Sequence, residues 1–125
     1  MPAYGFLVEF EAKPGKEEDV AQFLIDAKEL VDAEPGTLAW FSFRLGPTSF
    51  RIFDAFETED DREAHLQGKV RDQIEARGAE LFSVPPTITP VNLLPLHLAR
   101  RAVALPLALL AALLVAAFAL RSVSA

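Results

Sequence analysis

Apolar and polar side chains alternate along residues 4–11, near the start of the chain. Phe6, Val8 and Phe10 fall on one face of an extended segment, whereas Glu9 lies on the other. A period of two is typical of a β-strand that is buried on one side only. The sequence therefore predicts a half-buried strand over these residues.

Three later segments also predict strands. Residues 37–45 and 50–57 are rich in aromatic side chains, which favour strands. The short turn between them predicts an antiparallel hairpin. Residues 87–94 predict the last strand. Pro90 within it cannot donate a ladder hydrogen bond, so we expect this strand at the edge of a sheet.

Apolar residues at helical spacing predict helices between these strands. The longest covers residues 17–31, opens with three acidic side chains and stops before a Pro-Gly pair. A capping box that starts at Thr58 predicts a short helix to about Leu66. Residues 69–82 predict a further helix, which a glycine weakens near its end.

These elements follow one another in the order βαββαβ within residues 1–95. Right-handed crossovers place the last strand beside the first, at the edge of the sheet that Pro90 indicates. We therefore expect an α+β, ferredoxin-like domain with an antiparallel sheet. The whole chain of 125 residues has the length of one domain.

Residues 102–120 differ from the rest of the chain because they contain only Ala, Leu, Val, Phe and Pro. As a helix, they would rise about 28 Å, close to the hydrocarbon thickness of a bilayer. The segment is apolar on all sides, unlike an interfacial helix, which has a polar face. It predicts a C-terminal transmembrane helix. The alternatives are a helix buried in an oligomer and a poorly ordered apolar extension.

Basic residues flank this apolar segment unequally. Residues 96–101 form a short basic linker with Arg100 and Arg101, whereas the tail of residues 121–125 contains only Arg121. The positive-inside rule then places the N-terminal domain in the cytoplasm, anchored to the inner membrane. The N-terminus lacks the basic and apolar regions of a signal peptide, so export of the domain is not expected.

The charge of the chain is distributed unevenly. All 18 acidic residues and nine of the 12 basic residues lie within residues 1–98. An acidic domain without a basic stripe argues against nucleic-acid binding. The chain has no cysteine, which excludes disulfides and cysteine-ligated metals.

Four stretches of the domain resemble one known family. They are residues 34–48 (EPGTLAWFSFRLGPT), 53–56 (FDAF), 64–66 (AHL) and 85–91 (PPTITPV). Together they resemble the antibiotic biosynthesis monooxygenase family over about residues 4–95. The resemblance implies a homodimeric α/β barrel whose two sheets face each other. It also implies oxidation of quinol-like or polycyclic phenolic substrates with O2, without metal or flavin.

His65 is the candidate catalytic residue, because the resemblance aligns it with a histidine that family members place over the pocket. A neutral imidazole titrates near working pH and could take the proton of a phenol. The resulting electron-rich anion could then reduce O2 without a cofactor. The alternative is a surface histidine on a short acidic helix.

Three aromatic residues are candidates for binding a flat substrate. Trp40 and Phe53 could stack on its rings, and Phe56 lies on the same predicted strand as Phe53. The commoner fate of such side chains is a place in the core or in a dimer interface. Both interpretations are open from the sequence.

Two arginines, Arg44 and Arg51, lie on adjacent predicted strands around the short turn. Either could hold an anionic oxygen of a substrate. The alternative is a salt bridge with Asp54 or Glu57, across strands or in a dimer. Asp54 interrupts an apolar face and therefore needs a partner if it is buried.

Other functions fit the sequence less closely. The sequence does not exclude a second function, that of a dimeric, non-catalytic module at the membrane. Such a module would bind a small ligand or a partner protein. In the haem-degrading branch, the helical histidine is accompanied by an Asn on the first strand and a Trp on the third, and both are missing here. The sequence shows no metal site, because His65 and His97 are far apart and the clustered acids suit helix N-termini.

Overall fold

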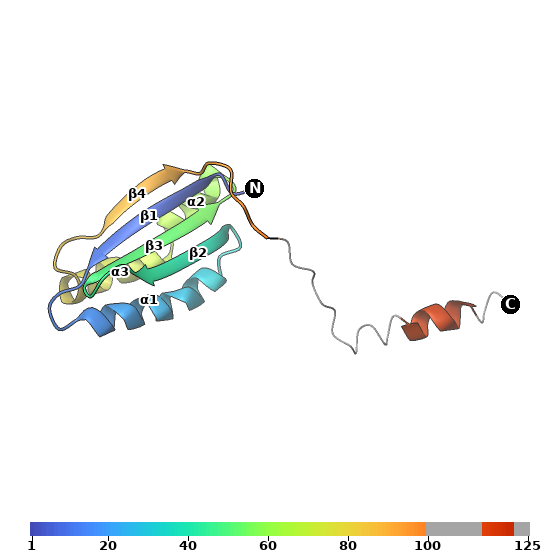
Figure 1. Cartoon of the computed structure of the whole chain (residues 1–125), viewed down its shortest axis with the longest axis horizontal. Helices are drawn as coiled ribbons and strands as arrows, with labels where there is room; N and C mark the ends of the chain where they lie inside the picture. The colour runs from blue at the N-terminus through green and yellow to red at the C-terminus, as the bar shows by residue number, and fades with distance from the viewer. Residues whose placement is uncertain (100–113, 122–125) are drawn as a thin grey trace.

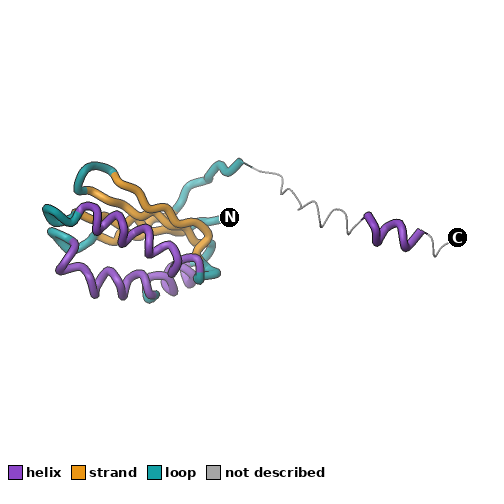
Figure 2. The backbone as a smooth tube through the Cα atoms, turned by 90° about the horizontal axis from the view of Figure 1, so that it is seen from below, coloured by secondary structure: helices purple, strands orange, loops and turns teal. Residues whose placement is uncertain are grey.

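The computed structural model describes residues 1–99 and 114–121 of the chain. Within residues 1–99, four strands form one antiparallel sheet in the order β2-β3-β1-β4, with three helices on one of its faces (Figures 1 and 2). This arrangement confirms the expected α+β, ferredoxin-like fold. The elements are β1 (Tyr4–Glu11), α1 (Glu17–Asp32), β2 (Thr37–Arg44), β3 (Ser49–Phe56), α2 (Glu59–Leu66), α3 (Lys69–Leu81) and β4 (Thr87–Asn92).

Strand β1 lies in the middle of the sheet, between β3 and β4. Phe6 pairs with Asp54 of β3 on one side and with Pro90 of β4 on the other. Pro90 therefore lies in an edge strand, as its missing backbone donor predicts. The right-handed crossover rule and the local proline signal point to the same place, and both are confirmed.

The alternation in β1 and β3 explains why the core lies between the sheet and the helices. Even-numbered residues of both strands face the helices, while odd-numbered residues face away. Helix α1 contributes an apolar stripe to the same core. The buried residues of this core include Phe6, Val8, Phe10, Val20, Phe23, Leu24, Phe50, Ile52, Phe56, Ile74, Leu81 and Phe82.

Helix α2 begins at the cap that the sequence predicts. Oγ1 of Thr58 accepts a hydrogen bond from the backbone N–H of Asp61 at 3.1 Å. This bond satisfies one of the donors that the first turn of a helix leaves free. The cap fixes where α2 starts and therefore which of its side chains point toward the sheet.

The opposite face of the sheet is apolar along one cross-strand row. Leu7 of β1 pairs with Phe53 of β3, which pairs with Phe41 of β2. None of the helices within residues 1–99 covers this face (Figure 2). Phe41 is 58% exposed. We call Leu7, Phe41 and Phe53 the open sheet face.

The predicted membrane helix lies mostly outside the described residues. Residues 114–121 are helical and their side chains are exposed. In the described ranges, 1–99 and 114–121, no helix combines the length and the apolar character needed to cross a bilayer. The segment 102–120 therefore remains a prediction from the sequence, as do the linker and tail boundaries.

Candidate functional site

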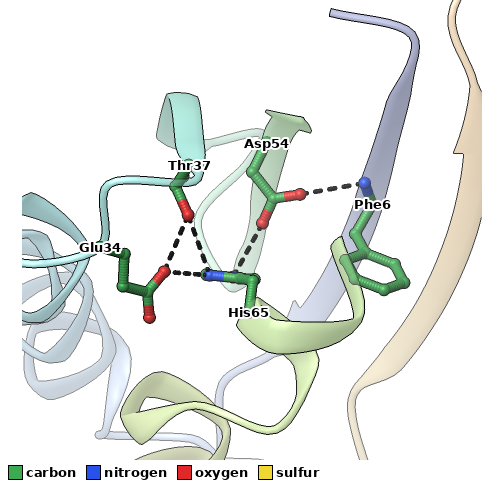
Figure 3. A network of polar contacts seen from close by, with 5 residues as sticks. All are labelled: Phe6, Glu34, Thr37, Asp54 and His65. Atoms are coloured by element: carbon green, nitrogen blue, oxygen red, sulfur yellow. Dashed lines mark hydrogen bonds and ion pairs between the residues drawn. The ribbon is translucent and has the colours of Figure 1, made fainter. Parts of the chain in front are cut away.

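His65 lies between two carboxylates, where α2 meets the sheet (Figure 3). Its Nδ1–H donates to Oε2 of Glu34 at 2.5 Å, and its Nε2 lies 3.1 Å from Oδ2 of Asp54. The side chains of His65 and Asp54 are only 9% and 1% exposed. With the partly exposed Glu34, they form a cluster of charged groups, which we call the His65 cluster.

Three separate elements bring the His65 cluster together. Asp54 is an even-numbered residue of β3 and so faces the helices, and its Oδ1 accepts the backbone N–H of Phe6 at 2.9 Å. Glu34 lies in the turn between α1 and β2, where Oγ1 of Thr37 donates to its Oε2 at 2.8 Å. Each carboxylate is thus held in place by a hydrogen bond from a group other than the imidazole.

The surroundings of His65 favour its charged form. Burial of the ring lowers its pKa, but hydrogen bonding and the negative charges of Asp54 and Glu34 raise it more. The pKa of His65 is therefore raised above the usual 6.5. An imidazolium between two carboxylates leaves the cluster with one net negative charge.

A small cavity adjoins the inner side of the His65 cluster. Its volume is about 20 Å³, and Asp54 and His65 form part of its wall. Such a volume holds about one water molecule. Among the described residues, Oδ2 of Asp54 has no well-directed hydrogen bond besides its ion pair with His65. A water in this cavity would therefore find an acceptor in the carboxylate.

A larger groove runs between the helices α2 and α3 and the edge strand β4. Its volume is about 920 Å³, in the range of small-molecule sites. It shares five wall residues with the small cavity, which therefore lies directly behind the groove. These shared residues are Phe6, Leu66, Arg71, Ile74 and Ile88. The rest of its wall includes Lys13, Arg62, Glu63, Glu75, Phe82, Val84, Pro85, Pro86 and Pro90.

Most of the domain matches one known family. Residues 3–76 match the family described as antibiotic biosynthesis monooxygenase. The chain belongs to this family. A comparison with curated proteins gave no match.

Solved structures of similar proteins extend the comparison. A protein of unknown function from Nitrosomonas europaea is 44% identical, with a TM-score of 0.77 over 81% of this chain and 98% of the other. A Mycobacterium tuberculosis protein is 18% identical, with a TM-score of 0.64 over 80% of this chain and all of the other. A candidate antibiotic biosynthesis monooxygenase from Caulobacter crescentus is 15% identical. Its TM-score is 0.64, over 75% of this chain and 92% of the other. The latter two likenesses show the fold alone.

The aromatic residues proposed for this family member do not form one stacking site. Trp40 pairs with Asp54 and so lies on the helix side of the sheet, half-buried, whereas Phe53 lies on the open sheet face. Phe56 is fully buried in the core, with its ring centroid 5.2 Å from that of His65. None of the three aromatic residues lines the groove. A role in substrate binding stays a prediction for each.

The two candidate arginines form ion pairs, as the alternative interpretation expects, but with other acids. Arg44 contacts Glu18 of α1 at 2.8 Å, and its guanidinium lies over the ring of Phe50. Arg51 contacts Glu9 across strands at 3.3 Å, on the face of the sheet away from the helices. Neither arginine lines the groove.

Sequence reasoning missed the groove and one member of the His65 cluster, Glu34. It singled out Asp54 as a buried acid in need of a partner, and that partner is His65 rather than an arginine. Nothing in the local pattern pointed to Glu34, because its position before a Pro-Gly pair is explained by the end of a helix. The groove residues are ordinary apolar positions within their own segments.

Proposed function

We propose that this protein is a cofactor-independent monooxygenase that oxidises a quinol-like or polycyclic phenolic molecule with O2. The observation that carries the proposal is the mostly apolar groove of about 920 Å³, with a charged, buried proton acceptor directly behind its wall. Membership of the antibiotic biosynthesis monooxygenase family supports the same reaction class. The substrate itself supplies the electrons, so that one oxygen atom enters the product and the other leaves as water.

The His65 cluster would take the phenolic proton in this proposal. A neutral imidazole is the simplest base, but the neighbours of His65 favour its charged form. Oδ2 of Asp54 is then the available acceptor, reached through a water in the small cavity. His65 would keep Asp54 oriented and balance its charge. It would also release its Nδ1 proton toward Glu34 when Asp54 accepts one.

Oxygen uptake tests the proposal directly. The full chain is incubated with a panel of quinols and hydroxynaphthalenes in an oxygen electrode, with a chelator present throughout. We expect uptake with at least one substrate, and its loss in Asp54→Asn and His65→Ala. Unchanged uptake in His65→Ala would remove His65 from the mechanism. Saturable binding without oxygen uptake would instead support a non-catalytic ligand-binding module.

We also propose a homodimer in which the open sheet faces of the two protomers pack against each other. An exposed row of large apolar side chains in the middle of a sheet is costly in water and typical of an interface. Leu7, Phe41 and Phe53 supply such a row, in which Phe41 is exposed and the other two side chains are partly exposed. The resemblance of the sequence to dimeric barrels supports the same face.

The proposal also places the protein at the cytoplasmic membrane through residues 102–120. Their composition supports this placement, and a membrane anchor would suit a substrate drawn from the bilayer. Membrane fractionation tests it by comparing the full chain with a truncation after Leu98. A full chain that stays in the aqueous fraction, like the truncation, would contradict the anchor.

A further inference from the structure

Arg62 is an almost buried cation in the wall of the groove. Its side chain is 16% exposed, although it belongs to the first half of the short helix α2. The guanidinium carbon lies 5.2 Å from the ring centroid of Tyr4 and 5.6 Å from that of Phe6. These aromatic faces hold the guanidinium in place without neutralising its charge.

The guanidinium of Arg62 has few partners for its five N–H groups. One nitrogen donates to the backbone carbonyl of Val91 at 3.2 Å, which ties α2 to β4. Its nearest acid among the described residues is Glu59 at 3.9 Å, a largely exposed side chain. An exposed pair at that distance contributes little. Arg62 therefore retains donors and a positive charge that the described residues do not satisfy.

The other cations of the groove wall are already engaged. Arg71 is 40% exposed and contacts Glu75 at 2.9 Å. Lys13 donates to the backbone carbonyl of Ala79. Glu63, the second acid of the wall, accepts a hydrogen bond from Gln67 at 3.0 Å. Arg62 is thus much less exposed than Arg71 and, unlike Arg71, has no carboxylate at close hydrogen-bonding distance.

We infer that Arg62 is an anion-binding subsite of the groove, which takes the carboxylate or phenolate oxygen of an aromatic ligand. This inference rests on the proposed function, in that it takes the groove as the small-molecule site. The apolar wall would hold the rings of the ligand, and the planar guanidinium would bind its anionic oxygen by two N–H donors. Contact with Arg62 would also favour the deprotonated form of a phenol, the form that reacts with O2.

A pair of probes with the same ring system tests the subsite. The full chain is titrated with 2-naphthoate, an anion, and with 2-naphthamide, its neutral counterpart, by isothermal titration calorimetry. We expect 2-naphthoate to bind more tightly. Arg62→Gln should weaken binding of 2-naphthoate about tenfold or more and leave that of 2-naphthamide nearly unchanged. Arg62→Lys should fall between, because it keeps the charge and loses the planar pair of donors.

Arg71→Gln is the matched control, since Arg71 lines the same groove but is paired with Glu75. If Arg71→Gln weakens the binding of 2-naphthoate as much as Arg62→Gln does, the effect comes from the overall charge of the groove. The proposed subsite at Arg62 is then wrong. The subsite also fails if Arg62→Gln weakens both probes equally, because its role is then structural. If 2-naphthamide binds as tightly as 2-naphthoate, the groove is still a ligand-binding site, but Arg62 is not an anion-binding subsite within it. Binding of neither probe would overturn the groove itself, and with it the proposed function.

Discussion

Nε2 of His65 lies 3.1 Å from Oδ2 of Asp54, and the two side chains are among the least exposed charged groups of the domain. A carboxylate buried to this extent is tolerated only with a partner of opposite charge. The contact joins α2 to the C-terminal half of β3, while Glu34, in the turn after α1, contacts the same imidazole. The packing of α1, α2 and β3 against one another thus depends on the protonation state of His65.

The stability of the domain should depend on pH through His65. Its pKa is raised in the folded state, so the imidazolium stabilises the fold fully below the unfolded value of about 6.5. This contribution is lost as the pH rises through the folded pKa. We expect the free energy of unfolding to fall over that range, and to fall less in His65→Gln. Urea unfolding at a series of pH values measures both.

Nuclear magnetic resonance checks the same prediction at the residue itself. Imidazole nitrogen shifts should show His65 protonated at both nitrogens near pH 6.5, with a titration midpoint above that value. The chain has two histidines, so a His97→Asn variant assigns the signals. A midpoint for His65 at or below 6.5 would contradict the charged cluster.

Asp54→Asn should destabilise the fold strongly. It leaves a buried imidazolium beside an amide, and breaking a buried pair in this way costs about 3 kcal/mol or more. The amide oxygen can still accept the N–H of Phe6, so the loss reports mainly on the ion pair. Chemical denaturation at pH 6 measures the change, and the titration midpoint of His65 should also fall.

Glu34→Gln is the matched control for this variant. Glu34 contacts the other nitrogen of the same ring but is partly exposed, so we expect a loss of only about 1 kcal/mol. The double variant Asp54→Asn/His65→Gln should be less unstable than the sum of its single changes, because both remove one interaction. Simple additivity would show that Asp54 and His65 act independently.

Much of the fold follows from local signals. The alternation in β1, the cap at Thr58 and the proline in β4 each act within a few residues, and each agrees with the topology. The open sheet face required more, because its row depends on which residue of β2 lies opposite Phe53. The two strands keep one register from Arg44 and Phe50 at the turn to Ala39 and Ala55, so this pairing depends on the geometry of the turn.

The site was less predictable for a physical reason. Its residues come from the α1–β2 turn, β3, α2, α3 and β4, and they meet only when the sheet and the helices pack. His65 was identified through a family resemblance and Asp54 through its break in an apolar face. Arg62 gave no signal, because a basic residue in the first half of a short helix looks like a solvated side chain until β4 covers it.

Gly5→Ala should disrupt the middle of the sheet. A Cβ atom at Gly5 would lie 2.4 Å from the backbone oxygen of Asp54, which cannot move without shifting β3. We expect a loss of about 2–3 kcal/mol, as for other overpacked core positions. Gly46→Ala is the control, because no atom lies within 4 Å of the added Cβ. Thermal unfolding of both variants measures the difference, and equal melting temperatures would contradict the close approach.

Phe41→Glu should dissociate the proposed homodimer. Phe41 is 58% exposed on the open sheet face, and a carboxylate there would be buried against the partner without a counter-charge. Because the side chain is exposed within the protomer, the fold should persist. Ile25→Glu is the matched control, since Ile25 is 63% exposed on α1, away from that face. Sedimentation velocity should show monomers for Phe41→Glu and dimers for Ile25→Glu. Dimers in both variants would place the interface elsewhere.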